Sequence, residues 1–142
     1  MEAAGGASGS RRLLRRLRDL MASGGTAQER LDRMVAFEEL LGREGYLVVK
    51  FWLHLSRKAQ KRRLEALERD PLQKWRVRPI DWKYFKRYDR FREVSESAIR
   101  RTSTGAAPWH IIAAADENFR NLSVARVLLQ ALTAVLAAAG HA

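Results

Sequence analysis

The sequence predicts an α/β domain in which a parallel sheet is flanked by helices. Two segments, residues 46–55 (YLVVKFWLHL) and 109–115 (WHIIAAA), consist almost entirely of β-branched, aromatic and other apolar residues. Short apolar runs of this kind are typical of strands that are buried in a parallel sheet. Each segment is followed by residues with helical periodicity, and strands that alternate with helices favour parallel pairing.

Three of the predicted helices follow residues that make good N-caps. The stretch 26–29 (TAQE) is a capping box, in which Thr26 and Glu29 satisfy each other's backbone N–H groups. Ser56 and Asp116 precede the other two helices and are also favoured N-cap residues. These helices are expected over about 27–44, 57–69 and 117–138, the first ending at Gly45 and the second before an Asp-Pro pair.

A fourth helix is expected from about Ile80 to near Arg101. Apolar and aromatic residues recur on it every three or four positions, which predicts a face that packs on the sheet. Basic residues form a second stripe that is rotated away from this face and left for solvent or a ligand. The predicted packing face consists of Phe85, Tyr88, Phe91, Val94 and Ala98.

The composition indicates one domain with an anionic partner. The chain has 142 residues, and its 27 Lys and Arg against 16 Asp and Glu give a net charge of +11. Such an excess implies nucleic acid, a phosphorylated ligand or an acidic membrane surface. The absence of Cys excludes disulfides, thiol catalysis and thiolate metal sites, and the three His are too scattered for a zinc motif.

The ends of the sequence carry no secretion signal or obvious membrane anchor. Residues 1–10 are small and Gly-rich, and we expect a disordered lead. Residues 11–21 (RRLLRRLRDLM) predict a surface helix, with a transit peptide or a membrane-surface helix as alternatives. The apolar run 127–139 is shorter than the roughly 20 residues of a membrane span. We therefore expect a cytoplasmic protein without a membrane partner.

His54 lies at the carboxyl end of the first predicted strand, where α/β proteins place ligand sites. The sequence offers it no identifiable partner for general acid–base chemistry. A structural role is therefore the favoured interpretation, and no catalytic residue is assigned.

Three stretches resemble a known family, and they occur in the order that the family shows. They are residues 37–56 (FEELLGREGYLVVKFWLHLS), 70–81 (DPLQKWRVRPID) and 101–109 (RTSTGAAPW). Together they resemble the polyphosphate kinase 2 family, and within it the domains of polyphosphate:AMP phosphotransferases. The resemblance extends from roughly Arg30 to Leu132.

The resemblance implies a nucleoside-kinase-like P-loop fold and a Mg²⁺-dependent transfer of a phosphoryl group between inorganic polyphosphate and a nucleotide such as AMP. The basic segment over about 57–101 resembles the family's lid, which closes over the phosphates. Residues 11–142 are then expected to be the C-terminal part of such a domain. The lid residues implied to bind phosphate are Arg63, Lys74, Arg76 and Asp81.

Other positions of the motif match or depart from the family. Asp70, Pro71 and Trp75 match the lid pattern, as do Pro108 and Trp109 before the last strand. Two positions depart from it, since many members have a basic residue in place of Leu67 and Ser in place of Arg78.

The family's phosphate-binding Gly-rich loop (Walker A) and the acidic strand that follows it (Walker B) have no counterpart in the sequence. The Gly-rich stretch GGASGS contains no Lys and does not open a helix of the required kind. Phosphoryl transfer needs backbone N–H groups and a Lys around the donor, and an acidic residue for Mg²⁺. We therefore expect no metal site from the residues identified here, and a fragment that is inactive alone.

Three hypotheses follow. The first is a fragment of a polyphosphate-dependent nucleotide phosphotransferase whose lid still binds polyphosphate. The second is a non-catalytic polyanion-binding or assembly module, which forms a homo-oligomer or needs a partner to complete its sheet. The third is a nucleic-acid-binding protein. The third is disfavoured because the predicted packing face leaves few aromatic rings free to stack on bases.

Overall fold

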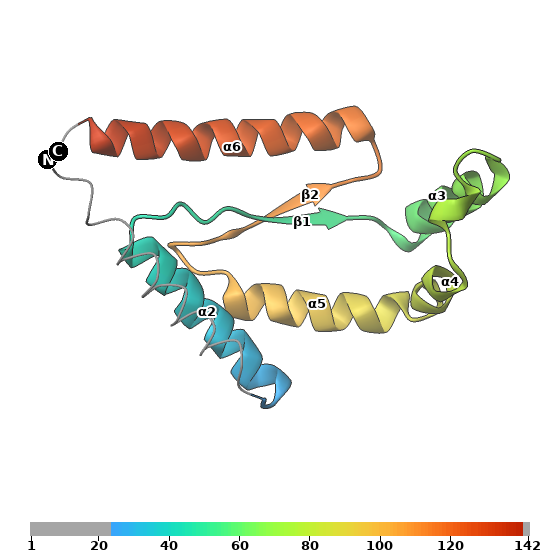
Figure 1. Cartoon of the computed structure of the whole chain (residues 1–142), viewed down its shortest axis with the longest axis horizontal. Helices are drawn as coiled ribbons and strands as arrows, with labels where there is room; N and C mark the ends of the chain where they lie inside the picture. Colours follow the sequence, from blue (N-terminus) through green and yellow to red (C-terminus); the bar gives the residue numbers. More distant parts are fainter. Residues whose placement is uncertain (1–23, 141–142) are drawn as a thin grey trace, which may run out of the picture.

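The computed structural model describes residues 24–140, which form a parallel two-stranded sheet with helices on both sides (Figure 1). The predicted α/β class is confirmed. Residues 1–10 and the helix expected over 11–21 lie outside the described residues. The elements are α2 (Ala27–Arg43), β1 (Lys50–His54), α3 (Arg57–Arg69), the 3₁₀-helix η1 (Lys74–Arg76), α4 (Pro79–Lys86), α5 (Tyr88–Thr102), β2 (Trp109–Ala113) and α6 (Glu117–Ala139).

Strands β1 and β2 pair in parallel, with Lys50 opposite Trp109 and His54 opposite Ala113. Helix α6 lies along one face of this sheet, and α5 lies along the other (Figure 1). Both strands are shorter than predicted. Residues 46–49 do not join the sheet, because β2 begins only at Trp109 and offers them no partner. Instead the Tyr46 N–H donates to the Leu41 carbonyl at the end of α2.

The capping interactions predicted from the sequence are present. The Thr26 and Glu29 side chains each accept a hydrogen bond from the other's backbone N–H, at 3.2 and 2.9 Å. Ser56 and Asp116 each accept from the backbone N–H three residues later. Gly45 follows α2 with a φ of +82°, a conformation that a side chain disfavours. Local sequence therefore fixes where α2, α3 and α6 begin.

The single helix expected over 80–101 is wrong, because the structure has two helices there. Arg87 separates α4 from α5, with φ −101° and ψ 16°. The break allows α4 to turn toward α3, where the Trp82 Nε1–H donates to the Glu68 carboxylate at 2.6 Å. Trp82 also meets Phe85 edge-on, with ring centroids 5.7 Å apart. A contact between two helices, rather than helical propensity, thus decides the geometry of this segment.

A buried Lys joins four elements in the interior. The Nζ of Lys50 on β1 lies 2.6 Å from the Glu38 carboxylate on α2 and 2.6 Å from the Thr102 carbonyl at the end of α5. The Lys50 and Glu38 side chains are 7% and 6% exposed. Lys50 also lies 5.2 Å from the ring centre of Trp109 on β2, whose Nε1–H donates to the Thr102 hydroxyl. A buried charge requires such partners because it has lost its hydration.

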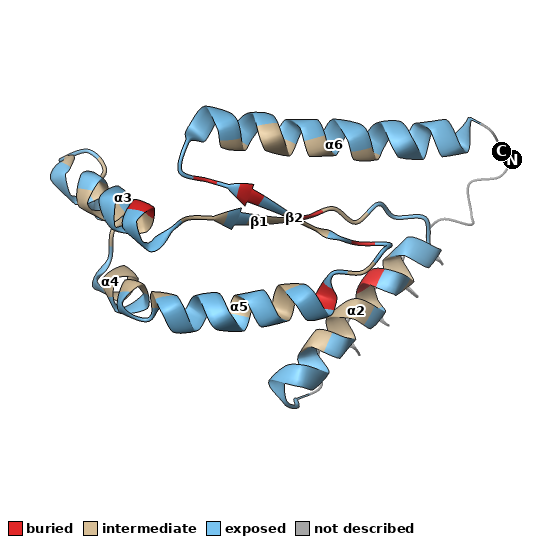
Figure 2. Ribbon diagram, turned by 180° about the vertical axis from the view of Figure 1, so that it is seen from behind, coloured by how far each residue is buried: buried red, intermediate tan, exposed pale blue. Residues whose placement is uncertain are grey.

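Few apolar side chains are fully buried. Among the described residues, the buried apolar side chains are three Ala and one Ile. Figure 2 shows buried residues mainly near the sheet and at the junction of α2 with α5. Of the predicted packing face, Phe85 on α4 and Tyr88 and Ala98 on α5 are half-buried. The prediction is wrong at Phe91 and Val94, which are 64% and 63% exposed. Two strands are too narrow a sheet to cover the length of that helix.

Helix α6 is long and apolar enough to cross a membrane, when judged on length and composition alone. This differs from the sequence expectation, which counted only the run 127–139. The helix begins at Glu117 and therefore adds ten residues to that run. In the structure α6 runs beside β2 on one face of the sheet (Figure 1).

The buried ion pair predicts a large effect of replacing Lys50. Lys50→Met leaves Glu38 buried without a cation, and we expect the free energy of unfolding to fall by about 3–5 kcal/mol. Urea denaturation followed by circular dichroism measures this change. Lys61→Met is the control, because Lys61 forms an exposed pair with Glu65 at 3.6 Å, and its loss should be within about 0.5 kcal/mol. Equal effects of the two substitutions would contradict the assigned role of Lys50.

Candidate functional site

The carboxyl ends of β1 and β2 meet at one edge of the sheet, because the strands are parallel and in register. Helix α3 begins soon after β1, and α6 begins soon after β2. Both helix N-termini therefore lie near this edge (Figure 1). A helix N-terminus carries a partial positive charge and unpaired N–H groups, and ligands of open α/β sheets bind at this edge.

A cavity of about 310 Å³ lies at this edge. Small side chains form part of its wall, and two of them, Ala59 on α3 and Ala114 after β2, are buried. Leu55 and charged side chains from both helices form the rest. We call it the arginine cavity, and it is lined by Leu55, Ala59, Arg62, Arg63, Ala114, Ala115, Glu117 and Arg120.

The arginine cavity has an excess of positive charge, with three Arg against one Glu. Arg120 is held in place, since its guanidinium lies 3.2 Å from the Glu117 carboxylate and 3.2 Å from the Asn121 side-chain oxygen. Arg62 and Arg63 are exposed and have no hydrogen-bond or ion-pair partner within residues 24–140. Free guanidinium groups can grip phosphate oxygens through two parallel hydrogen bonds. The cavity is therefore suited to an anion with several oxygens.

Helix α3 is fixed relative to α5 by contacts beside this cavity. Arg57 in the first turn of α3 pairs with Asp89 on α5 at 2.7 Å and lies 5.5 Å from the ring centre of Phe85. The Tyr88 hydroxyl donates to the Leu55 carbonyl just after β1 at 2.7 Å. These contacts hold the first turn of α3, and with it Arg62 and Arg63, at the end of the sheet.

Two of the predicted phosphate-binding residues, Lys74 and Arg76, lie on η1 and do not line the arginine cavity. Asp70 organises the turn before them, because its carboxylate accepts hydrogen bonds from the Leu72 N–H and the Gln73 side chain. Gln73 in turn accepts from Arg76 at 3.0 Å. Both cations are exposed. The structure thus presents them to solvent beyond the end of α3.

Asp81 serves as a helix cap. Its carboxylate accepts from the backbone N–H of Arg78 at 2.8 Å and lies 3.7 Å from the Nε of the same residue. Asp81 therefore stabilises the first turn of α4, and it does not join Arg63 in the arginine cavity. Of the four residues implied to bind phosphate, Arg63 alone lines that cavity.

The sequence of the chain matches a family model described as Polyphosphate kinase 2 over residues 9–138. The chain belongs to the polyphosphate kinase 2 family. It is 49% identical over 107 residues to a polyphosphate:AMP phosphotransferase of Pseudomonas aeruginosa, a match that covers 75% of this chain and 22% of that protein. It is 37% identical over 105 residues to an AMP/ADP-polyphosphate phosphotransferase of Meiothermus ruber, covering 74% of this chain and 39% of the other.

A solved structure agrees with this assignment. Polyphosphate kinase 2 from Arthrobacter aurescens TC1 superposes with a TM-score of 0.74 at 30% identity, over 76% of this chain and 39% of that one. The expected kinase-like α/β fold of the polyphosphate kinase 2 family is thereby confirmed. The chain spans well under half the length of these relatives.

The family resemblance implies Mg²⁺, but the described residues do not form a site for it by themselves. No group of three or more His, Asp or Glu side chains in residues 24–140 lies where it could hold a metal ion. Glu117 is the one carboxylate of the arginine cavity, and it is paired with Arg120. Mg²⁺ is held in proteins by one or two carboxylates together with waters and substrate phosphates, and the pairing with Arg120 occupies the carboxylate of Glu117.

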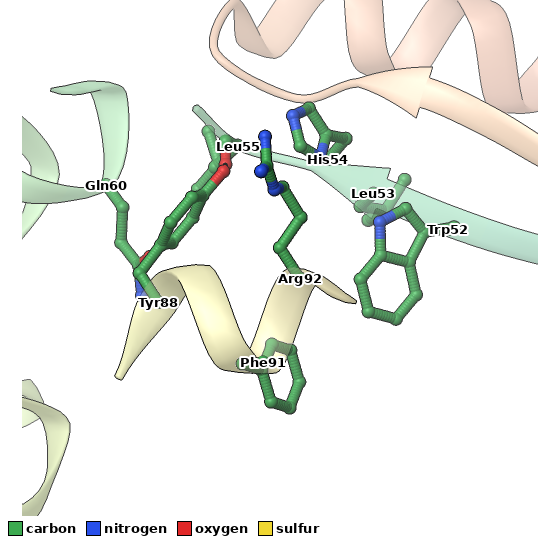
Figure 3. A pocket seen from close by; sticks show the side chains of 8 residues that line it. All are labelled: Trp52, Leu53, His54, Leu55, Gln60, Tyr88, Phe91 and Arg92. Atoms are coloured by element: carbon green, nitrogen blue, oxygen red, sulfur yellow. The ribbon is translucent and has the colours of Figure 1, made fainter. Parts of the chain in front are cut away.

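A second pocket, of about 220 Å³, lies between β1 and α5 (Figure 3). Trp52 and Phe91 stack there, with ring centroids 6.2 Å apart. Arg92 extends between Tyr88 and Trp52 toward His54 (Figure 3). A guanidinium cannot take up a proton, so Arg92 gives His54 no partner for acid–base chemistry. The structural interpretation of His54 stays a prediction.

Sequence reasoning missed Arg62 and Arg120, although a signal for both was available. Each lies in the first two turns of the helix that follows a strand carboxyl end. A basic residue at such a position reaches the ligand-binding edge of a parallel sheet when it lies on the side of the helix that faces this edge. The sequence does not show which side of each helix faces this edge. The structure shows that the adjacent residues Arg62 and Arg63 both line the cavity.

The capping role of Asp81 predicts that its replacement affects folding more than ligand binding. Asp81→Ala removes the acceptor for the Arg78 N–H, and we expect the free energy of unfolding to fall by about 0.5–2 kcal/mol. Affinity for a fluorescent polyphosphate probe should stay within about twofold, since a capping carboxylate makes no contact in the cavity. Glu93→Ala on the exposed side of α5 is the control. Unchanged stability together with a large loss of affinity would restore Asp81 to the binding site.

Proposed function

We propose that this chain carries the phosphate-binding part of a polyphosphate-dependent nucleotide phosphotransferase of the type that forms ADP from AMP and polyphosphate. The observation that carries the proposal is the convergence of Arg62, Arg63 and Arg120 at the carboxyl edge of the sheet. Because the chain belongs to the polyphosphate kinase 2 family, we expect polyphosphate to be the ligand of that anion site.

Inorganic polyphosphate is a flexible chain of identical anionic groups, so its recognition needs several cations in sequence rather than one deep pocket. The arginine cavity supplies the first group of cations. Lys74 and Arg76 on η1 supply a second group that is exposed and held on an ordered turn. We propose that residues 57–101 act as the lid that brings the second group over a chain bound in the first.

The residues of this chain bind and orient phosphate but do not complete a kinase centre. The 142 residues contain no GxxxxGK[ST] loop, and the described part holds no cluster of acidic metal ligands. In phosphoryl transfer the Gly-rich loop, its Lys and the metal neutralise the developing charge. We therefore propose that these 142 residues alone bind polyphosphate without transferring phosphate.

Two other functions stay open. An assembly module is favoured by the sheet, since β1 pairs only with β2 within the described residues and its other edge is unpaired. The second is nucleic-acid binding, and the sequence-based argument against it is weakened because several aromatic rings are exposed. The rings of Trp75, Tyr84 and Phe91 are between 61% and 76% exposed and interleave with basic residues, and exposed rings can stack on bases.

The salt dependence of polyphosphate binding should show whether the proposed lid cations contact the ligand. Changing Arg63, Lys74 and Arg76 together to Ala should flatten the log–log salt dependence of the affinity by about two units, at about 0.7 per lost contact. Fluorescence anisotropy at several NaCl concentrations measures the slope. The matched control is Arg30, Arg43 and Arg100 together to Ala, which removes the same charge from exposed positions on α2 and the end of α5.

Equal slopes for the two triple variants would show that overall charge, rather than the proposed site, binds polyphosphate. The same assay includes single-stranded DNA as a competitor. Stacking contributes roughly 1–3 kcal/mol per base, so DNA that outcompetes polyphosphate of equal charge would replace the proposed function by nucleic-acid binding.

The missing donor cradle predicts the outcome of an activity assay. The purified 142-residue chain, incubated with Mg²⁺, AMP and polyphosphate, should form no ADP above the enzyme-free blank. Coupled detection of ADP measures this, and the Pseudomonas aeruginosa polyphosphate:AMP phosphotransferase is the positive control. Robust ADP formation that is lost on changing Lys74 and Arg76 would show that the chain is catalytic by itself.

A further inference from the structure

Helix α6 is apolar on two opposite sides, although only one side faces the sheet. Ser123, Val127 and Ala131, each four residues from the next, are half-buried. Ser123 and Val127 share a cavity of about 560 Å³ with residues of β2. A helix that is apolar all round is normally covered on all sides. No residue of α6 is fully buried, so the far side lacks such a cover within the described part of the chain.

The uncovered side of α6 carries a heptad pattern. Apolar residues recur there at alternating spacings of three and four, which is the pattern of helices that pack as a coiled coil. Its four Leu are between 52% and 71% exposed. Figures 1 and 2, which view the molecule from opposite sides, show no other element over this side. We call it the outer seam, and it consists of Leu122, Ala125, Leu129, Leu132, Leu136 and Ala139.

We propose that the outer seam binds the outer seam of a second copy of this chain, with the two α6 helices antiparallel. In this arrangement Leu129 lies opposite Leu132 of the second copy, and the layers to either side pair a large residue with a small one. Ala125 lies opposite Leu136, and Leu122 lies opposite Ala139. Large and small residues on facing positions fill the space between two helices evenly.

A parallel pair would be packed less well. It places each residue of the outer seam opposite itself, so Ala125 meets Ala125 and leaves a gap between layers of Leu. Both arrangements are closed pairs in which each copy uses the same surface, so packing rather than symmetry favours the antiparallel one. The antiparallel helix dipoles add a small favourable contribution.

The charges beside the outer seam fit the same arrangement. The seam contains no charged residue. Arg126 flanks it and lies opposite Thr133 of the second copy, so two basic residues do not meet. On the other flank Leu128, 39% exposed, lies opposite Val135, 46% exposed. The interface therefore adds apolar area without bringing together the charges of a chain with a net charge of +11.

Insertion of α6 into a membrane is the alternative explanation for the exposed apolar surface. The helix meets the length and composition of a membrane span. Insertion would, however, remove its inner side from β2 and place Arg120 and Arg126 in lipid, at considerable cost. Association of two copies keeps α6 on the sheet and covers only the exposed side.

Engineered cysteines test the proposal directly, because the natural chain has no Cys. We expect Ala125→Cys alone and Leu136→Cys alone to form no disulfide-linked dimer on mild oxidation, and a 1:1 mixture of the two to form one. In the antiparallel pair each Cys faces the other position, whereas identical positions are separated by about 16 Å along the helix axis, beyond the reach of a disulfide. Self-crosslinking of each single variant would overturn the antiparallel arrangement.

Sedimentation equilibrium of the full chain supplies the second measurement. We expect a dimer whose dissociation constant rises at least about tenfold on Leu129→Lys, because the charge falls in the centre of the interface. Gln130→Lys adds the same charge to the adjacent exposed position outside the seam, and its effect should be below about threefold. A monomeric natural chain, equal effects of the two variants, or cosedimentation with neutral phosphatidylcholine vesicles that Leu129→Lys abolishes would each overturn the proposal.

Discussion

The buried contact between Lys50 and Glu38 is the interaction on which the arrangement of this chain depends. It links α2 to β1, and through the Thr102 carbonyl it also fixes the end of α5. Thr102 in turn receives the indole N–H of Trp109, the first residue of β2. Because few apolar side chains are fully buried, directional polar contacts set the relative positions of the elements more than they do in a well-filled core.

The candidate site follows from this framework. In-register pairing brings the ends of both strands to one edge, so the two helices that follow them present Arg62, Arg63 and Arg120 to one cavity. The Arg57–Asp89 pair and the Tyr88–Leu55 hydrogen bond then fix α3 beside it. The proposed phosphate-binding surface arises from strand register and helix placement, and the proposed lid cations on η1 extend it.

The narrow sheet explains what remains exposed. Two strands cannot cover both flanking helices, so apolar residues of α5 and α6 face solvent. The relatives that this chain resembles are much longer than the segment that matches it. The unpaired edge of β1 and the outer seam of α6 are therefore two separate surfaces. The first continues a sheet by backbone hydrogen bonds, and the second packs side chains.

The sequence alone predicts the α/β class, the two strands, the N-caps at Thr26, Ser56 and Asp116, and the motifs that place the chain in its family. These features depend on contacts within three or four residues, or on motifs that can be read in order. The break at Arg87, the entry of Arg120 into the arginine cavity and the exposure of Phe91 and Val94 are visible only in the folded chain. Each of these depends on which distant element lies alongside, and a local pattern does not carry that information.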